Sequence, residues 1–407
     1  MSRIMKEVAT SRSRLLSPRN ALWLAFVIAL IMLCSACTGP GSSSSSSSGT
    51  SQSTSSQVAS STVLTLPTTA PTLPDVPTTA PTIPTVNVPS GPAGVITEFP
   101  LSNPIYNAGG ITLGPDGNLW FTENGQIASM TPQGSITEFP VPSGGEHLNG
   151  ITTGPDGNLW FAEENQIGRI TPSGTFTEFP IPPDDAVPLG GPFQITTGPD
   201  GNLWFTEGNA KTPIGRITPA GAITEFPVPV PTTYGASINS ITAGPDGNLW
   251  FTEGDSGPYG SPDTYEIGRI APDGTVTKFP LPSGLSELGA ITLGPDRNLW
   301  FTAVMVGAGN VIQGGWIGRI TPSGTFSGFL APNVVGGLSW ITTGPDGNLW
   351  FTESNDNRIG RITPAGAITE FPLPTGNGTP YAITSGPDGT LWFTGVYGEI
   401  GRITSGT

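Results

Sequence analysis

Two adjacent side chains, Glu146 and His147, are the first candidates for chemistry in this sequence. His147 is the single histidine among the 407 residues. Histidine is the side chain best suited to accept a proton near neutral pH, and a histidine beside a carboxylate could act as a general base. The alternative is a loop histidine without a catalytic role, and the sequence leaves both interpretations open.

Eight aromatic residues outside the regular repeats form a second candidate set. They are all six tyrosines of the chain and two tryptophans: Tyr106, Tyr234, Tyr259, Tyr265, Trp316, Trp340, Tyr381 and Tyr397. Such side chains combine a large apolar surface with a polar group, which suits a solvent-facing site for a glycan, a peptide or a cyclic small molecule. The alternative is that they only cap the core of the fold.

Other chemistry has no recognisable motif here. The sequence contains no phosphate-binding glycine loop, no cysteine and histidine metal cluster and no Gly-x-Ser-x-Gly nucleophile. After residue 37 the chain carries 29 acidic and 10 basic residues, a net charge of about −19. Nucleic acids and anionic membrane surfaces are therefore not expected as partners.

Residues 1–36 are typical of a lipoprotein signal peptide. Five basic residues precede an apolar stretch from Ala21 to Leu33, which is too short for a membrane-spanning helix of roughly 20 residues. Small residues then lead to Cys37, in a segment that resembles a bacterial lipobox. We predict that Cys37 is lipidated and holds the protein on the outer face of the cell membrane; plain cleavage would instead give a secreted protein.

Residues 37–94 are predicted to be a disordered linker. Serine, threonine, glutamine and glycine dominate its first half, and a Pro-Thr-Thr-Ala-Pro-Thr motif occurs twice in its second half, beginning at Pro67 and Pro77. Neither half can bury a core, and the proline-rich part favours an extended polyproline II conformation. The linker could therefore hold a folded domain away from the membrane, or serve as a passive spacer.

Residues 95–407 contain seven repeats. The segment Gly114-Pro-Asp-Gly-Asn-Leu-Trp-Phe121 recurs every 40 to 50 residues, and its tryptophans are Trp120, Trp160, Trp204, Trp250, Trp300, Trp350 and Trp392. This period suits a four-stranded blade, so we predict an all-β, seven-bladed β-propeller. In the second repeat the strands are expected at 150–153, 158–163, 167–171 and 175–179. Tryptophans that recur in every blade are expected to pack between blades rather than to bind a ligand.

The two ends of the repeat region are expected to meet. The last residues, Ile400 to Thr404, match the third strand of a blade, and the chain ends before a fourth. The segment from Val95 to Pro100 matches a fourth strand but precedes the first blade. We predict that it pairs with the last strand, which closes the ring and removes two free sheet edges.

Function is expected on one face of the ring. In an antiparallel blade the first and third turns lie on one face, and the other connections lie on the opposite face. The first set is short and uniform, whereas the second varies and carries every candidate residue above. Variable insertions on one face of a repeat protein usually mark its binding face.

Tandem units of Gly-Ile-Thr-x-Gly-Pro-Asp-Gly-Asn-Leu-Trp-Phe-Thr-Glu, followed by Ile-Gly-Arg-Ile-Thr-Pro, resemble the virginiamycin B (streptogramin) lyase family. The resemblance implies a Mg²⁺-assisted lyase that opens the ester of a cyclic depsipeptide by elimination, with histidines just before the first strand of a blade. The corresponding positions in this chain are Gly109, Asn149, Phe193, Asn239, Gly289, Ser339 and Tyr381, and none is histidine.

Three functions therefore remain open. A cell-surface protein could bind a ligand on its aromatic face without catalysis. A diverged lyase or lactonase could use a divalent metal and loop carboxylates, with Glu146 and His147 as weak catalytic candidates. A scaffold could hold partner proteins of the cell envelope. We expect a monomer that contacts the membrane only through its lipid.

Overall fold

A computed structural model describes most of the repeat region. The described residues are 92–101, 109–123, 125–144, 147–182, 191–207, 214–229, 236–255, 264–307, 311–331, 333–334, 337–374 and 378–406. Their only regular elements are β-strands, which confirms the all-β prediction, and they include no helix that could cross a membrane. The signal peptide, Cys37 and the linker up to residue 91 lie outside them.

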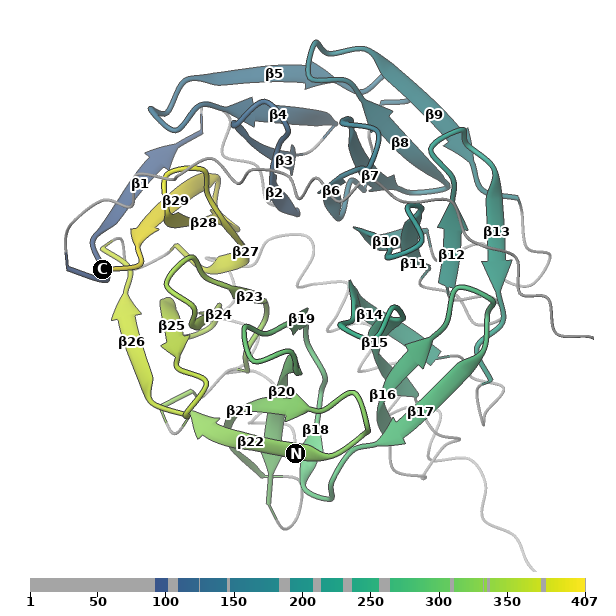
Figure 1. The fold of residues 1–407 in the computed structure, drawn as a ribbon. Coiled ribbons are helices and arrows are strands. Elements are labelled where there is room, and N and C mark those ends of the chain that lie inside the picture. The colour runs from purple at the N-terminus through teal and green to yellow at the C-terminus, as the bar shows by residue number, and fades with distance from the viewer. Residues whose placement is uncertain are drawn as a thin grey trace, which may run out of the picture. The chain divides into compact units, whose positions relative to one another are not determined.

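Seven antiparallel sheets are arranged around a common axis, and Figure 1 shows the first strand of each at the centre of the ring. Blade 1 contains β2 (Ile111–Leu113), β3 (Leu119–Glu123), β4 (Gln126–Met130) and β5 (Ile136–Pro140). Blade 2 contains β6 (Ile151–Thr153), β7 (Leu159–Glu163), β8 (Gln166–Ile170) and β9 (Phe176–Pro180). Blade 3 contains β10 (Pro192–Thr197), β11 (Leu203–Glu207), β12 (Ile214–Ile217) and β13 (Ile223–Phe226). Blade 4 contains β14 (Ala236–Ala243), β15 (Leu249–Asp255), β16 (Thr264–Ile270) and β17 (Val276–Pro280).

The last three blades follow the same order with two variations. Blade 5 contains β18 (Leu285–Ser286), β19 (Ile291–Leu293), β20 (Leu299–Val306), β21 (Ile312–Ile320) and β22 (Phe326–Ala331). Blade 6 contains β23 (Ile341–Thr343), β24 (Leu349–Glu353), β25 (Arg358–Ile362) and β26 (Ile368–Pro372). Blade 7 contains β27 (Pro380–Ser385), β28 (Thr390–Gly395), β29 (Glu399–Thr404) and, from the start of the domain, β1 (Ile96–Pro100).

The predicted closure of the ring is confirmed. Strand β1 pairs antiparallel with β29, with Ile96 opposite Ile403 and Phe99 opposite Ile400. The pairing continues outward, because the Gly94 amide donates to the Thr404 carbonyl over 2.9 Å. Strand β29 is thus paired on both sides, with β28 and β1, and β1 completes blade 7 as a four-stranded sheet.

Two blades differ from the prediction in their connections. In blades 4 and 5 the variable connection between the second and third strands, expected from the sequence to be a loop of thirteen residues, is partly strand, since β15 and β20 run on to Asp255 and Val306. In blade 5 the longer β20 also pairs with an unpredicted fifth strand, β18. Insertions whose backbone hydrogen bonds can be satisfied by extending an existing hairpin need not form a free loop.

Each repeat tryptophan is fully buried between two blades, as predicted. Trp120 packs on Ile151, Leu159 and Phe161 of blade 2 and stacks on Phe139 of its own blade, with ring centroids 5.4 Å apart. This packing also explains a conserved glycine within the repeat. A Cβ atom at Gly114 would lie 2.3 Å from the Trp120 ring, so only glycine fits there.

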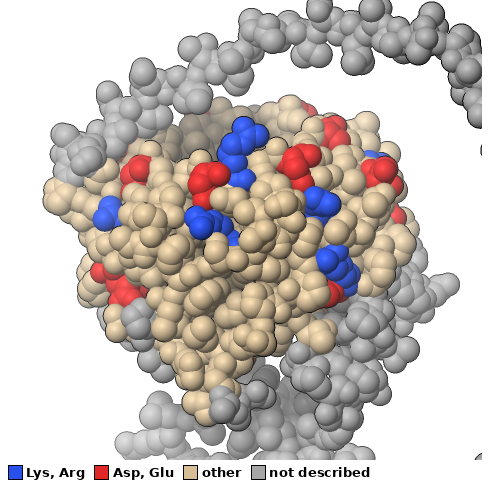
Figure 2. Space-filling model, turned by 60° about the horizontal axis from the view of Figure 1, so that its bottom comes forward, with Lys and Arg blue, Asp and Glu red and all other residues tan. Residues whose placement is uncertain are grey.

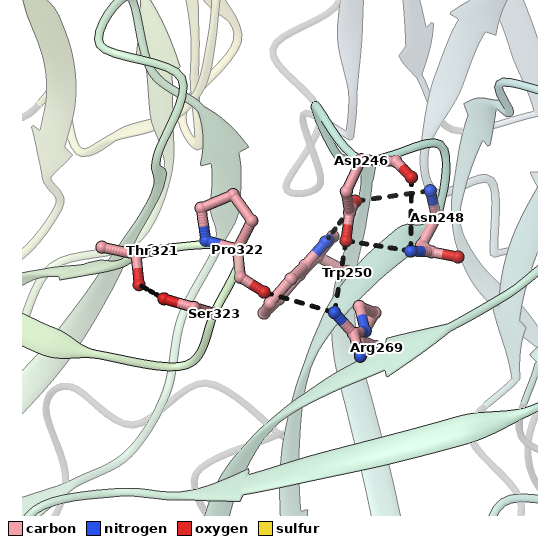
Figure 3. Close-up of polar contacts among 7 residues, drawn as sticks. All are labelled: Asp246, Asn248, Trp250, Arg269, Thr321, Pro322 and Ser323. Atoms are coloured by element: carbon pink, nitrogen blue, oxygen red, sulfur yellow. Dashed lines mark hydrogen bonds and ion pairs between the residues drawn. The ribbon is translucent and has the colours of Figure 1, made fainter.

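A polar cluster fixes the tryptophan, and Figure 3 shows it in blade 4. The Trp250 indole donates to Asp246 over 3.0 Å, and the Arg269 guanidinium lies over the indole with its carbon 5.5 Å from the ring centroid. Arg269 is 3.4 Å from Asp246 and donates to the carbonyl of Pro322 in blade 5. Burial raises the pKa of Asp246, but hydrogen bonds from Asn248 and Trp250 outweigh that effect and the net pKa is lowered.

This cluster changes the role expected for the repeated arginines. In the sequence, arginines recur on the third strands and glutamates on the fourth, a pattern that predicts ion pairs between them on a solvated surface. Instead, each arginine lies over its blade's tryptophan and pairs with the aspartate of the first turn. Each also donates to a backbone carbonyl of the next blade, which lies in that blade's third turn or, for Arg361, at Ser405 just after β29. The last of them, Arg402, donates to Pro132 of blade 1 and so helps to close the ring.

We define the turn face as the side of the ring with the first and third turns of each blade, and the loop face as the opposite side. Most first turns place a glycine with φ between +72° and +80° at one position, where an added Cβ would meet nothing within 4 Å. In blade 5 that position is Arg297, with φ of +61°. The repeated Gly-Pro-Asp-Gly turn predicts a left-handed residue at this position, and Arg297, which replaces the glycine, adopts that conformation at the cost of backbone strain.

We predict that Arg297→Gly raises the free energy of unfolding by about 1 kcal/mol, because glycine adopts this φ without strain. Arg297→Ala is the matched control, since it removes the same side chain but keeps a Cβ in the left-handed region. Chemical denaturation of both variants measures the difference. Equal stabilisation by alanine would show that the side chain, not the backbone, carries the strain.

Candidate functional site

Seven equivalent residues surround the axis on the loop face. We call them the mouth ring: Gly109, Asn149, Phe193, Asn239, Gly289, Ser339 and Tyr381. They line two cavities, a smaller one of about 270 Å³ toward blades 1, 2 and 7 and a larger one of about 360 Å³ toward blades 4, 5 and 6. These seven positions are equivalent in the repeat, and they are the positions at which the family resemblance implies histidines. The fold brings all of them into one site.

An aromatic wall separates the two cavities. Phe193, Trp340 and Tyr381 line both of them, and the rings of Trp340 and Tyr381 lie 5.5 Å apart at an angle of 52°. Trp340 also lines a third cavity of about 160 Å³ between the innermost strands. Burial raises the pKa of Tyr381, so its hydroxyl keeps its proton at neutral pH.

Hydrogen bonds between blades hold the backbone of the mouth ring. The hydroxyls of Thr122 and Thr352, each on the second strand of its blade, donate over 2.7 Å to the carbonyls of Asn149 and Tyr381 in the following blades. Thr394 closes the series by donating to Gly109 of blade 1. Five of the seven mouth residues therefore have their carbonyls held by a threonine of the preceding blade.

The polar side chains of the mouth ring donate hydrogen bonds to neighbouring loops. Asn149 donates from its amide nitrogen to the Pro192 carbonyl over 3.0 Å, and Asn239 donates to the Leu288 carbonyl over 3.1 Å. Ser339 lies 2.7 Å from Ser354, which itself donates to the Pro380 carbonyl. Since a serine hydroxyl has one proton, Ser339 must donate to Ser354. Ser339 is thus left with oxygen lone pairs to offer a ligand, whereas each asparagine amide keeps one further N–H beside its oxygen.

Two ionisable side chains lie just before the mouth ring. His147 and Glu287 each precede a ring residue by two positions, and both have left-handed backbones, with φ of +59° and +47°. His147 lines the smaller cavity and Glu287 the larger one. Strained residues of this kind often occur at functional sites. The sequence placed Glu287 among the loop carboxylates of this face, and its spacing from Gly289 repeats that of His147 from Asn149.

The structure gathers some of the predicted site residues and not others. Trp340 and Tyr381 line both mouth cavities, Tyr265 lines the larger one and His147 the smaller one. Trp316 and Tyr397 are not among the residues that line either cavity. Glu146, Tyr106, Tyr234 and Tyr259 lie outside the described residues.

Trp316 has a packing role within blade 5. It lies opposite Ala303 on β20, where five of the other six blades place a glutamate, and next to Gly328 on β22. A Cβ at Gly328 would lie 2.6 Å from the Trp316 indole nitrogen, so the glycine makes room for the ring. The sequence does carry a signal for this packing role. Ala303 and Gly328 replace the glutamates that most blades have on their second and fourth strands, and both losses occur in the blade that contains Trp316.

The glutamates that end the second strands are buried and are not among the residues that line the mouth cavities. Burial and repulsion by Glu370 raise the pKa of Glu353 to about 7, although Arg358 opposes the shift. Blade 7 has Gly395 instead, and Glu399 uses the space, since a Cβ at Gly395 would lie 2.4 Å from its carboxylate. Burial and the charge of Glu98 raise the pKa of Glu399 to about 7.

The mouth is a poor fit for the Mg²⁺ that the family resemblance implies. Magnesium prefers octahedral oxygen ligands and is usually held by carboxylates. Among the residues that line the two cavities, Glu287 is the only carboxylate and His147 the only imidazole. They line different cavities, so they cannot share one ion. Across the described part of the chain, no three His, Cys, Asp or Glu side chains are grouped for a metal.

Comparison with known proteins gives consistent matches. A sequence profile described as the virginiamycin B lyase family matches residues 94–311 and 309–407. Virginiamycin B lyase from Staphylococcus aureus is 36% identical, with a TM-score of 0.65, over 76% of this chain and 99% of the other. A streptogramin B lyase structure is 34% identical, with a TM-score of 0.62, over 76% of this chain and 97% of the other.

A further solved relative is a catalytically inactive histidine-to-alanine variant of the S. aureus lyase with quinupristin. It is 36% identical, with a TM-score of 0.64, over 76% of this chain and 99% of the other. The extracellular domain of a hybrid two-component system from B. thetaiotaomicron shares the fold at 16% identity and a TM-score of 0.54. A search of curated proteins found no match.

The raised pKa of Glu353 predicts a pH-dependent stability. The native state binds the proton more tightly than the unfolded state, so the free energy of unfolding is unaffected below about pH 4.5 and falls as the pH rises through about 7. We expect Glu353→Gln to be more stable than the wild type at pH 8 by about 1 to 3 kcal/mol, and to lose this advantage near pH 4.5.

Urea denaturation at both pH values measures this effect. Arg358 keeps its partner Glu370, 2.6 Å away, so the substitution leaves no buried cation alone. Glu164→Gln, on an exposed turn of blade 2, is the control and should show no such pH dependence. A Glu353→Gln protein less stable than the wild type at pH 8 would show that the ion pair outweighs the burial of the charge.

Proposed function

This chain belongs to the virginiamycin B lyase family, and on that premise we propose that it is a cell-surface protein that binds a small cyclic or peptide-like ligand at the mouth ring without cleaving it. The observation that carries the proposal is the pair of cavities at the mouth, which share one aromatic wall. Concave sites lined by aromatic residues and a few polar groups are typical of small-molecule binding.

The residues of the mouth ring favour binding over catalysis. Elimination needs a base near the substrate, and none of the seven ring positions offers one. In the S. aureus relative, replacement of one histidine gives a catalytically inactive protein that was obtained with quinupristin. By analogy, a family propeller without those histidines could still bind a related ligand.

The place where the linker joins the propeller supports a protein that is held at the cell surface with its binding site exposed. Residues Pro92 to Val95 lead into β1 beside Thr404, at the turn face, because Ile96 pairs with Ile403 and Pro100 with Glu399. The mouth lies on the loop face. A linker anchored through Cys37 on the outer face of the membrane would therefore attach opposite the binding site. If the leader is simply cleaved, the secreted domain keeps the same arrangement.

The proposed partner is a small molecule, a glycan or a peptide bound by a monomeric propeller. Figure 2 shows acidic and basic side chains interspersed over one side of the molecule, without a continuous basic patch in that view. Together with the formal net charge of −15, this agrees with the expectation that nucleic acid is not the partner.

One observation favours a second candidate function, a diverged lyase. His147 lines the same cavity as Tyr381 and Asn149, so a ligand in that cavity would lie near an imidazole. As a base, the imidazole would take a proton from the carbon alpha to a carbonyl, after which the C–O bond of the ester breaks to leave an alkene and a carboxylate. The Mg²⁺ of the family resemblance has no fitting ligand set among the described mouth residues.

We predict that the soluble domain binds quinupristin, and that Tyr381→Ala weakens binding by about tenfold or more because it removes part of the aromatic wall. Isothermal titration calorimetry measures the affinity. Tyr397→Ala is the matched control, since Tyr397 is about half exposed on the same face and lines neither mouth cavity. Equal losses in both variants, or no binding by the wild type, would contradict the assignment of the site.

Mass spectrometry of quinupristin after prolonged incubation separates binding from catalysis. We expect the ring to remain intact with the wild-type protein. A linear product that disappears in His147→Ala would instead establish the lyase and assign its base. The His147→Ala protein must retain the melting temperature of the wild type for that comparison, because His147 has a left-handed backbone.

A further inference from the structure

We propose that the larger mouth cavity selects a cationic amine, a protonated primary or secondary ammonium group on an apolar body. The inference rests on the proposed ligand-binding function and adds the charge and hydrogen-bonding character of the ligand. Three independent features of the cavity support it: its aromatic wall, its oxygen acceptors and its unneutralised carboxylate.

The aromatic wall offers ring faces to a cation. Trp340 and Tyr381 lie 5.5 Å apart at 52°, and Phe193 lines the same cavity. Tilted rings that share a cavity can face one bound group together. Tryptophan and tyrosine faces attract ammonium groups, and the attraction grows when water is excluded. All three residues are partly buried, so a bound group would lose part of its water here.

The polar side chains of the larger cavity offer acceptors. Asn239 gives one of its two amide protons to Leu288, and its oxygen accepts from Ser237. Ser339 gives its single hydroxyl proton to Ser354, whose own proton goes to Pro380. Ser339 therefore meets the cavity with lone pairs alone, and the Asn239 oxygen keeps one lone pair for a further donor. An ammonium group carries donors and no acceptor, so it matches this arrangement.

The larger cavity carries a negative charge, which also favours a cationic ligand. Glu287 lines the larger cavity, and no lysine or arginine is among the residues that line either mouth cavity. No salt bridge of Glu287 occurs within the described residues. Its left-handed backbone, with φ of +47°, is a strain that a packing role does not explain, because the side chain is exposed. The net charge of −15 adds a negative field around the whole molecule.

A neutral sugar matches the larger cavity less well. Each sugar hydroxyl presents lone pairs as well as a proton, and a buried lone pair without a donor costs free energy. Ser339 has spent its donor on Ser354, and Asn239 keeps only one of its two N–H donors, so few side-chain donors remain for such a ligand. A comparison of the affinities for an amine and for an alcohol of the same shape therefore tests the proposal most directly.

Three probes of similar shape test the proposal: benzylamine, benzyltrimethylammonium and benzyl alcohol, each titrated at pH 7 by calorimetry. We expect benzylamine to bind about tenfold more tightly than benzyl alcohol, because the charge and the N–H donors both contribute. Benzyltrimethylammonium keeps the charge without donors and should fall between them. Glu287→Gln should weaken benzylamine binding about threefold or more and leave benzyl alcohol unchanged.

Glu164→Gln is the control for a loss of general negative charge and should have no effect on any probe. Equal affinity for benzylamine and benzyl alcohol would overturn the proposal while leaving the mouth as a binding site. Benzyltrimethylammonium bound as tightly as benzylamine would overturn the role of Asn239 and Ser339. If none of the three probes binds but quinupristin does, the amine proposal fails alone; if quinupristin also fails, the proposed function fails with it.

Discussion

The structure depends on one buried side chain per blade, the tryptophan of the second strand. It fills the space between two blades, stacks on a phenylalanine of its own outer strand and donates its indole proton to an aspartate in the first turn. An arginine covers the same ring and reaches the next blade in six of the seven blades. Apolar burial, an ion pair and a contact between blades thus meet at one residue.

Because these contacts recur, they restrict most positions of the repeat. Gly114 is required by the tryptophan ring, and Gly168 is required by Phe161, whose ring would lie 2.0 Å from an added Cβ. The mouth ring is different, since its residues line the cavities at the axis and five of its seven carbonyls accept from a threonine of the preceding blade. Glycine, asparagine, phenylalanine, serine and tyrosine all occur there without change to the fold. Function can therefore vary at the mouth while the scaffold stays constant.

Two blades show how the fold compensates when a repeat residue is lost. Blade 5 lacks the usual carboxylates, and Trp316 fills the space beside Ala303 and Gly328. Blade 7 lacks the glutamate of its second strand, and the carboxylate of Glu399 occupies the room that Gly395 leaves. A residue that breaks the repeat is thus not by itself a sign of a binding site, because neighbouring substitutions can restore the packing.

The sequence by itself determined the architecture: seven blades, the pairing of Ile96–Pro100 with the last strand, the left-handed Arg297 and the buried tryptophans. Each of these features follows from the residues of a single turn or from a pattern that recurs in every blade. Both depend on residues that are close in the sequence, so they can be predicted from it. It also identified the loop face and the equivalent positions before each first strand. Only the tertiary structure decided which candidates meet at the mouth, because that depends on how far each strand extends and on which neighbours leave room. Hence Trp340 and Tyr381 form a wall, Trp316 packs inside a blade, and Glu287 enters the site.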